Sequence, residues 1–230
     1  MEPRHYLHRP SVLLTGFGPF PGIPVNASAL LVEMLARMAT TRWLDADIHA
    51  ATLPTEWRRG IDKLDTLWSR HAPDIALHFG VADRNTGFDL ERTAWNACCA
   101  TEDACGETAD VLHHGDDTLD TRSTTLPLDA IAGVLDGADI PNCISSDAGR
   151  YLCNAVYYRS LNIAEATQDA ALAGFIHIPS SLVGSGPQGL TPSPACPLDW
   201  STARTGAALI IDVAIAHWRK LRSERPVAVG

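Results

Sequence analysis

The sequence predicts an α/β protein with a mainly parallel sheet that is covered by helices on both faces. Short apolar runs of β type alternate with helical patterns along the chain, which is typical of βαβ units. Of the 230 residues, 46% are hydrophobic and 20% are charged, an ordinary composition for a globular core. No linker-like segment divides the chain, so we expect a single domain over 1–230 with flexible tails at 1–10 and 223–230.

The first half of the chain alternates strand and helix. Strands are expected where apolar residues follow one another, at 11–15, 48–53 and 75–79. A helix over 30–38 has Asn26 or Ser28 as its cap, and Glu33 stands four residues before Arg37. Thr55 is expected to cap a second helix, whose apolar residues recur at spacings of three and four: Trp57, Ile61, Leu64 and Trp68.

The second half continues the alternation with longer connections. Residues 91–99 are expected to be extended, and a short helix over 128–135 should end at Gly137. A strand over 140–146, a helix over 151–164, a strand over 174–178 and a long amphipathic helix over 203–222 follow. Three segments are expected to be loops: 16–25, 100–126 and 180–197.

Charge and composition exclude several classes of partner. A formal net charge of −9 argues against nucleic acid and against an anionic membrane surface, because both attract clustered Lys and Arg. No apolar run approaches the roughly 20 residues that span a bilayer. No signal peptide is visible, so we expect a cytoplasmic location with six reduced cysteines. Zinc is disfavoured because Cys98 and Cys99 are adjacent and no C-x2-C pair occurs, so no metal and no cofactor are expected.

The segment 146–154 (SDAGRYLCN) carries the strongest chemical signal. A β-type run meets a turn at Ala148 and Gly149, and a helix begins near Arg150, so Cys153 lies in its first turn. The free N–H groups and the positive dipole end of a helix stabilise a thiolate over a thiol. Cysteine on a helix is more often a packing residue, so this segment alone leaves both interpretations open.

A nucleophilic thiol needs a base and a group that orients the base. His177 is the best-placed histidine, because it stands at the carboxyl end of a short apolar strand, where parallel sheets gather their sites. Glu91 is the candidate orienting acid. Asp147 is a rival acid that also fits a role in shaping the turn.

The loop after the first strand is rich in glycine, proline and phenylalanine. It lacks both G-x-G-x-x-G and a P-loop lysine, so phosphate binding is not indicated. Phe17 and Phe20 instead offer a flat apolar surface, with Asn26 supplying a donor and an acceptor. Packing of both rings onto the core is the alternative.

Four separated segments together resemble the pyroglutamyl peptidase I (pyrrolidone-carboxylate peptidase) family of cysteine peptidases. They are LTGFGPF at 14–20 with VNAS at 25–28, ERTAWN at 91–96, SDAGRYLCN at 146–154 and GFIHIP at 174–179. The segments occur in the family's order, and the resemblance extends from about Ser11 to Trp218.

The resemblance implies a catalytic triad of Cys153, His177 and Glu91. It also implies that Phe17 and Phe20 sandwich the lactam ring of an N-terminal pyroglutamate, with Asn26 nearby. The expected substrates are peptides with N-terminal pyroglutamate, cleaved through a thioester acyl-enzyme. The resemblance also implies the fold, a single three-layer α/β/α domain with a mixed, mostly parallel sheet, similar to that of nucleoside phosphorylases. Homo-oligomers (dimer or tetramer) are common in the family.

The chain departs from the family around the acyl pocket. The family's Gly-Gln-Ala-Gly-Gly-Arg is replaced by GVADRN at 80–85, so Val81 stands in place of Gln and Asn85 in place of Arg. Pro21-Gly22 replaces Gly-Gly, Leu90 replaces a proline, and the segment after Pro179 also differs. Two alternatives therefore stay open: a thiol amidohydrolase of altered acyl specificity, and a non-catalytic binding homologue.

Overall fold

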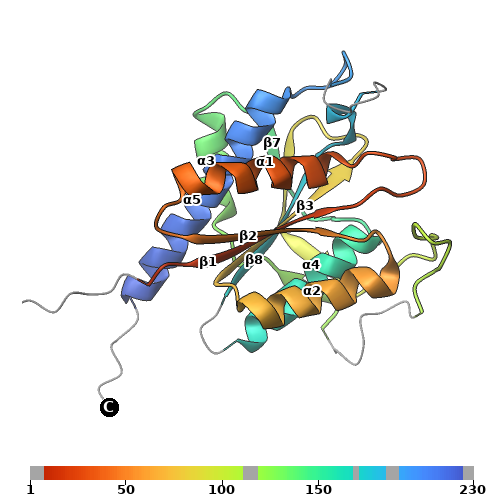
Figure 1. Cartoon of the computed structure of the whole chain (residues 1–230), viewed down its shortest axis with the longest axis horizontal. Helices are drawn as coiled ribbons and strands as arrows, with labels where there is room; N and C mark the ends of the chain where they lie inside the picture. Colours follow the sequence, from red (N-terminus) through yellow and green to blue (C-terminus); the bar gives the residue numbers. More distant parts are fainter. Residues whose placement is uncertain (1–7, 111–118, 168–170, 185–191, 225–230) are drawn as a thin grey trace, which may run out of the picture.

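A computed structural model of the chain describes residues 8–110, 119–167, 171–184 and 192–224. It contains a six-stranded sheet, a separate two-stranded sheet and five α-helices in the described residues (Figure 1). The elements are β1 (Ser11–Phe17), α1 (Ala27–Arg42), β2 (Asp47–Leu53), α2 (Trp57–His71), β3 (Ile75–Ala82), β4 (Phe88–Glu91), β5 (Thr93–Trp95), β6 (Thr121–Ser123), α3 (Leu128–Asp136), β7 (Asn142–Ser145), α4 (Leu152–Ala166), β8 (Leu172–Pro179), the 3-10 turn η1 (Ser180–Leu182) and α5 (Trp200–Glu224).

The strand order of the main sheet is β2-β1-β3-β8-β4-β7. Strands β2, β1, β3 and β8 run parallel to their neighbours, whereas β4 runs antiparallel to β8 and parallel to β7. The prediction of a mixed, mostly parallel sheet is therefore confirmed. The strand direction reverses between β8 and β4. In this antiparallel pair Glu91 on β4 lies opposite Phe175 on β8.

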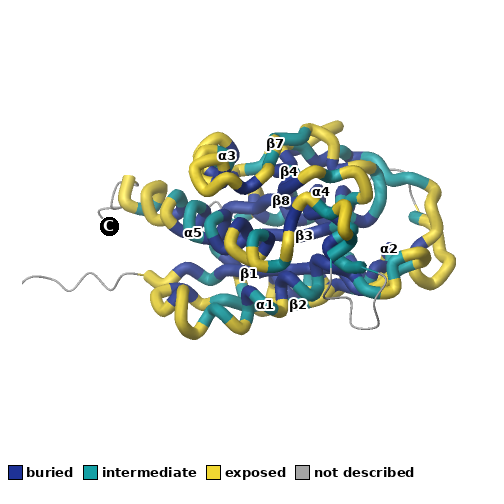
Figure 2. Tube along the Cα trace, turned by 90° about the horizontal axis from the view of Figure 1, so that it is seen from above, coloured by how far each residue is buried: buried dark blue, intermediate teal, exposed yellow. Residues whose placement is uncertain are grey.

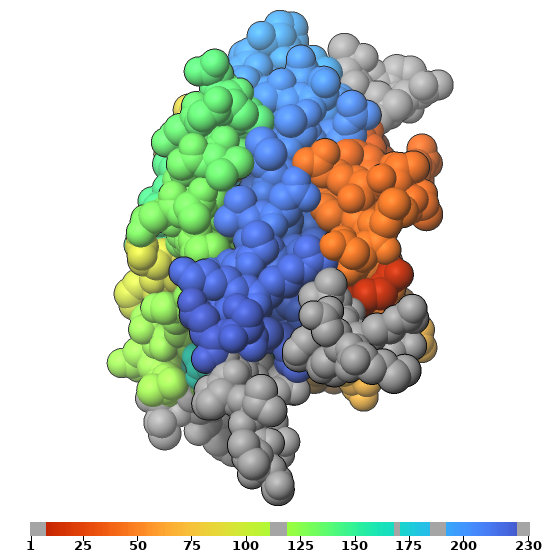
Figure 3. Space-filling model, turned by 90° about the vertical axis from the view of Figure 1, so that its left-hand side faces the viewer, coloured from red at the N-terminus to blue at the C-terminus, as the bar shows by residue number. Residues whose placement is uncertain are grey.

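Helices cover both faces of the sheet. Helices α1, α3 and α5 lie on one face and α2 and α4 on the other (Figure 1), with buried strands between exposed helix surfaces (Figure 2). Helix α5 runs between α3 and α1 and contacts both of them (Figure 3). Two apolar clusters fill the two interfaces, so the predicted three layers are confirmed. No helix of the described residues has the length and apolar character that crossing a membrane requires.

The first βα connection is held by a small network of side chains. Asn26 is the N-cap of α1, and its Oδ1 accepts from the Ser28 N–H at 3.1 Å. The Ser28 hydroxyl in turn accepts from the Phe17 N–H at 2.9 Å. A Cβ at Gly16 would stand 2.5 Å from the Ser28 carbonyl oxygen, so only glycine lets strand and helix approach this closely. The predicted cap and the predicted Glu33–Arg37 ion pair (2.5 Å) are both present.

The predicted cap of α2 is wrong. Helix α2 begins at Trp57, and the acceptor for the Trp57 N–H is Asp103 Oδ2 at 2.8 Å. Thr55 points elsewhere, because its hydroxyl donates to the Gly18 carbonyl at 2.9 Å. A residue far along the chain thus replaces the local cap and ties residues 100–107 to the start of α2.

The predicted extended run over 91–99 is only partly correct. The chain leaves the main sheet after Glu91, and Thr93–Trp95 pairs with β6 in a separate antiparallel ribbon. Strand β6 lies inside 100–126, which was expected to be a loop. Helix α5 reaches Glu224, so the expected C-terminal tail from 223 begins too early, and residues 1–7 and 225–230 lie outside the described residues.

A buried histidine links β1, β3 and α4. His78 is fully buried, with Nδ1 2.7 Å from the Thr15 hydroxyl and Nε2 2.7 Å from the Ser160 hydroxyl. Burial lowers the pKa of His78 from 6.5 to about 3, so the ring stays neutral in the folded protein. Both ring nitrogens are satisfied by hydroxyl groups, and this gives the residue a structural role.

His78 should make the protein acid-sensitive. Between about pH 3 and 6.5 the unfolded chain binds a proton at this position and the folded chain does not, so stability falls as pH decreases through that window. The expected slope is at most ~1.4 kcal/mol per pH unit. Urea unfolding across this range should show a smaller acid loss in His78→Gln than in the wild type, and equal losses would contradict the assignment.

Candidate active site

Three elements bring Cys153, His177 and Glu91 together. His177 stands on β8 and Glu91 on the adjacent β4, while Cys153 is the second residue of α4. On β8, Phe175 and His177 face the α2/α4 layer, because Phe175 packs in the cluster of that layer and Ile176 in the opposite one. The sequence separations are large, so only the tertiary fold creates this constellation.

The imidazole of His177 is held by Glu91 and lines the same pocket as Cys153. Its Nδ1 donates to Glu91 Oε1 at 2.8 Å. Since Nδ1 is occupied by Glu91, Nε2 is the nitrogen that faces the sulfur. His177 is 6% exposed, so only one edge of the site meets solvent.

The neighbours of His177 decide its charge. Burial alone would lower its pKa, but the hydrogen bonds to Cys153 and Glu91 and their negative charges raise it from 6.5 to about 10. The ring is therefore an imidazolium at neutral pH, a cation in the pocket that Cys153 at the start of α4 also lines.

Glu91 is a deeply buried carboxylate. It is 1% exposed, and its Oε2 has no hydrogen-bond partner among the described residues. The Tyr157 hydroxyl donates to the Glu91 carbonyl oxygen at 2.8 Å and fixes the backbone of β4 on α4. The His177 ring, which bonds Glu91 Oε1 at 2.8 Å, is the hydrogen-bond donor to this carboxyl group in the site.

The turn before Cys153 leaves the helix N-terminus open. Gly149 has φ +78°, a conformation that favours glycine. Asp147 Oδ1 accepts from the Gly149 N–H at 3.1 Å and from Arg150 Nη1 at 2.5 Å, so this acid shapes the turn and does not orient His177. Tyr151 is the N-cap but provides no side-chain cap, so the N–H groups at 152 and 153 stand available for an oxyanion.

A pocket of about 330 Å³ opens beside the thiol. Its walls include Phe17 and Phe20 from the first loop. Phe17 is buried against Phe175 with ring centroids 6.2 Å apart, and Phe20 lies 6.4 Å from the Tyr151 ring. All six residues expected at the site thus line one pocket: Phe17, Phe20, Asn26, Glu91, Cys153 and His177.

Asn26 occupies the pocket wall but its polar atoms are already engaged. Its Nδ2 donates to the Gly18 carbonyl at 3.0 Å, and its Oδ1 accepts from both the N–H and the hydroxyl of Ser28. Asn26 therefore holds the shape of the loop that carries Phe17 and Phe20.

Asp89 lines the pocket but is not among the residues expected at the site. Asn85, a departure from the family's pattern, and Thr55, expected as a helix cap, line the pocket as well. Asp89 stands two residues before Glu91 on β4, so strand alternation alone would place both on one face. Asn154 is a further missed residue, because its Nδ2 donates to the Trp95 and Ala97 carbonyls at 2.8 and 3.0 Å and ties the β5 segment to α4.

Gly80 controls the position of the sulfur. A Cβ at Gly80 would meet the Phe175 ring at 2.7 Å and the Cys153 Sγ at 3.0 Å. We expect Gly80→Ala to push the thiol away from His177 and to lower kcat about 100-fold, the effect of a displacement near 1 Å. Gly133→Ala is the control, since a Cβ there meets no atom within 4 Å. Unchanged kcat in Gly80→Ala, measured on a fluorogenic substrate, would contradict this placement.

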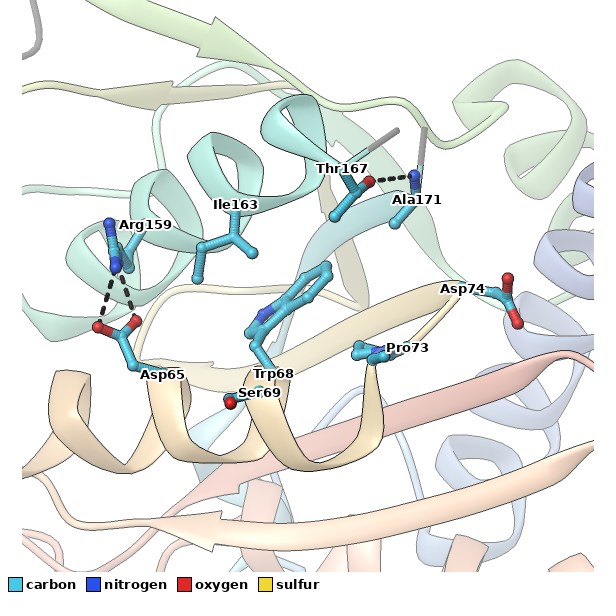
Figure 4. Close-up of a pocket in the computed structure, with 10 residues that line it drawn as sticks. Asp65, Trp68, Ser69, Pro73, Asp74, Arg159, Ile163, Thr167 and Ala171 are labelled. Carbon is cyan, nitrogen blue, oxygen red and sulfur yellow. Dashed lines mark hydrogen bonds and ion pairs between the residues drawn. The ribbon is translucent and has the colours of Figure 1, made fainter. Parts of the chain in front are cut away.

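A second hollow lies at the opposite edge of the sheet, next to the residues that precede β3 and β8. It measures about 500 Å³ and lies between the ends of α2 and α4 (Figure 4). Asp65 and Arg159 form a bidentate ion pair across its rim at 2.8 and 2.9 Å. Its described lining residues include neither cysteine nor histidine.

Metal chemistry has no site in the described structure. No group of three or more His, Cys, Asp or Glu side chains gathers around a metal position in the described ranges, and His113 and His114 lie outside them.

Comparison with known proteins points to one family. The pyroglutamyl peptidase family model matches residues 10–213. Pyroglutamyl-peptidase 1 of Mus musculus is 31% identical over 173 residues, 74% of this chain and 79% of that protein. Pyrrolidone-carboxylate peptidase of Pyrococcus furiosus is 32% identical over 169 residues, 73% of this chain and 80% of that protein.

Solved structures agree with the sequence matches. A variant of pyrrolidone carboxyl peptidase from Pyrococcus furiosus superposes with a TM-score of 0.78 at 27% identity, covering 90% of this chain and 99% of that one. Pyroglutamyl peptidase I from Bacillus amyloliquefaciens gives a TM-score of 0.78 at 26% identity, covering 91% and 98% of the two chains.

Proposed function

Since this chain belongs to the pyroglutamyl peptidase family of cysteine peptidases, we propose that it removes N-terminal pyroglutamate from peptides, with Cys153, His177 and Glu91 as its catalytic triad. The observation that carries the proposal is that the three side chains line one pocket, with His177 Nδ1 donating to Glu91 Oε1 at 2.8 Å. The substrate's lactam ring would lie in the pocket between Phe17 and Phe20.

Acylation begins with attack of the Cys153 thiolate on the pyroglutamyl carbonyl carbon. The carbonyl oxygen becomes an oxyanion and accepts from the N–H groups at the start of α4, where one well-placed donor contributes about 3 kcal/mol. His177 then gives its Nε2 proton to the leaving nitrogen, and the C–N bond breaks. The products of this half-reaction are a thioester on Cys153 and a peptide with a free amino terminus.

Deacylation reverses the roles of the same groups. The neutral His177 takes a proton from water, and the resulting hydroxide attacks the thioester carbonyl. The C–S bond breaks, pyroglutamate leaves, and the thiolate–imidazolium pair is restored. Glu91 stays ionised throughout and keeps the Nδ1 proton of His177 directed towards itself, so Nε2 alone exchanges protons with the substrate.

The test is turnover of pyroglutamyl-aminomethylcoumarin in a reducing buffer. We expect release of the fluorophore at a rate well above that of an N-acetyl-alanyl substrate, because the flat lactam ring can pack against the aromatic wall that Phe17 and Phe20 contribute to the pocket. Absence of pyroglutamyl hydrolysis by folded protein would overturn the proposal.

A second candidate keeps the thiol chemistry but changes the acyl group. It is favoured by Val81 and Asn85, which line the pocket and replace the family's Gln and Arg. Faster turnover of another small N-acyl group in the same assay would support this alternative over the first.

The proposal extends to the setting of the enzyme. A free thiolate nucleophile needs a reducing compartment, which supports a cytoplasmic location. We also propose a single peptidase domain that forms a homo-oligomer, a dimer or a tetramer. Light scattering on the full chain would determine the number of subunits.

A further inference from the structure

Most polar groups in the wall of the pocket are already engaged. Asn26 Nδ2 and the Thr55 hydroxyl both donate to the Gly18 carbonyl, at 3.0 and 2.9 Å. The Tyr151 hydroxyl donates to the Glu102 carbonyl at 3.1 Å. These residues give the pocket its shape, and their donors are directed into the protein.

Asn85 differs from these residues. It lines the same pocket, and its Nδ2 is buried without a hydrogen-bond partner among the described residues. It lies in the connection between β3 and β4, at the carboxyl end of β3, where Gly80 faces the thiol. A buried amide donor without a partner destabilises the free protein. A ligand group that enters the pocket and accepts a hydrogen bond from this donor removes that destabilisation, and its binding is strengthened accordingly.

The acyl group of the proposed substrate has a matching acceptor. Its five-membered lactam carries a carbonyl oxygen on the ring, and burial of that oxygen between two phenylalanine faces requires a donor. Resting on the proposed function, we infer that Asn85 Nδ2 donates to the lactam carbonyl oxygen and so determines the preference for an oxo ring. Asn85 lies within the segment 80–85 that departs from the family's pattern.

Three fluorogenic acyl substrates distinguish the contribution of the ring carbonyl from that of the ring N–H. Pyroglutamyl has the ring carbonyl and the N–H, 3-oxocyclopentanecarbonyl has the carbonyl alone, and cyclopentanecarbonyl has neither. We expect Asn85→Leu and the isosteric Asn85→Asp to lower kcat/KM about 10- to 100-fold on both oxo substrates, and to leave cyclopentanecarbonyl hydrolysis within about twofold of wild type. Thr86→Val, an exposed neighbour outside the pocket wall, is the control and should resemble wild type on all three.

The outcomes separate this inference from the proposed function. If the wild type hydrolyses the pyroglutamyl substrate and both Asn85 variants match it, the inference fails alone. A loss of kcat/KM on the pyroglutamyl substrate alone would also overturn the inference, because Asn85 would then bond the ring N–H and not the ring carbonyl. An equal loss on all three substrates would indicate a general structural role and contradict the inference. If the wild type hydrolyses no pyroglutamyl substrate, the proposed function itself fails.

Discussion

Replacing Cys153 by alanine is expected to lower kcat on pyroglutamyl-aminomethylcoumarin by about 10⁵- to 10⁶-fold, as loss of a triad nucleophile does in hydrolases. The reason is that the thioester cannot form without the sulfur, and the remaining oxyanion donors and pocket act only on a water reaction. Substrate binding should persist, because the pocket walls at Phe17 and Phe20 are unchanged.

A second cysteine serves as the matched control. Cys105 is exposed, lies in the connection between β5 and β6 and is not part of the pocket wall, so Cys105→Ala should keep full activity. Circular dichroism must show that both variants are folded. Appreciable turnover by folded Cys153→Ala would show that another group performs the chemistry.

Replacing Glu91 by glutamine is expected to lower kcat by about 10³- to 10⁴-fold. Glutamine has nearly the same shape, but it removes the negative charge that faces His177 and offers an amide donor to a ring nitrogen that itself donates. The imidazole then adopts the wrong tautomer, and its Nε2 no longer holds the proton that the leaving amine needs.

The pH profile gives this variant its specific signature. The pKa of His177 is raised to about 10, partly by Glu91, so the wild type should keep the thiolate–imidazolium pair until the pH approaches that value. In Glu91→Gln the alkaline limb of kcat/KM should move to lower pH. Glu33→Gln, on the exposed face of α1 beside Arg37, makes the same chemical change and should alter neither rate nor profile. An unshifted alkaline limb in folded Glu91→Gln would contradict the role of Glu91.

The local patterns of the sequence predict most of the fold. Consecutive apolar residues at 11–15 and 75–79 mark strands that the structure contains, and Asn26 caps α1 as expected. The direction of β4 has no such local signal, since Phe88–Glu91 is short and its antiparallel partner β8 lies more than 80 residues away. The cap of α2 fails for the same reason, because its acceptor Asp103 comes from a distant segment.

The candidate site, like the fold, is predicted from the sequence only in part. Cys153, Glu91 and His177 are found from motifs, and the structure brings them to one pocket. Motifs cannot predict which amide group of the pocket is free to bind a ligand, because this depends on the hydrogen bonds that all the neighbouring groups make. Asn26 is the natural choice from sequence, yet its amide is used within the loop, while Asn85 keeps an unused donor.

The reversal of strand direction beside β8 has a consequence for how the protein acquires activity. Glu91 and His177 are 86 residues apart, and they meet only when β4 inserts between β8 and β7. Contacts of such long sequence separation form late, because the entropy of closing a long loop must be overcome first. A chain in which the helices have formed but β4 is not yet inserted would have Cys153 at the start of α4 but no Glu91 to orient His177. The Glu91–His177 bond therefore exists only in a chain whose β4 is in place between β8 and β7.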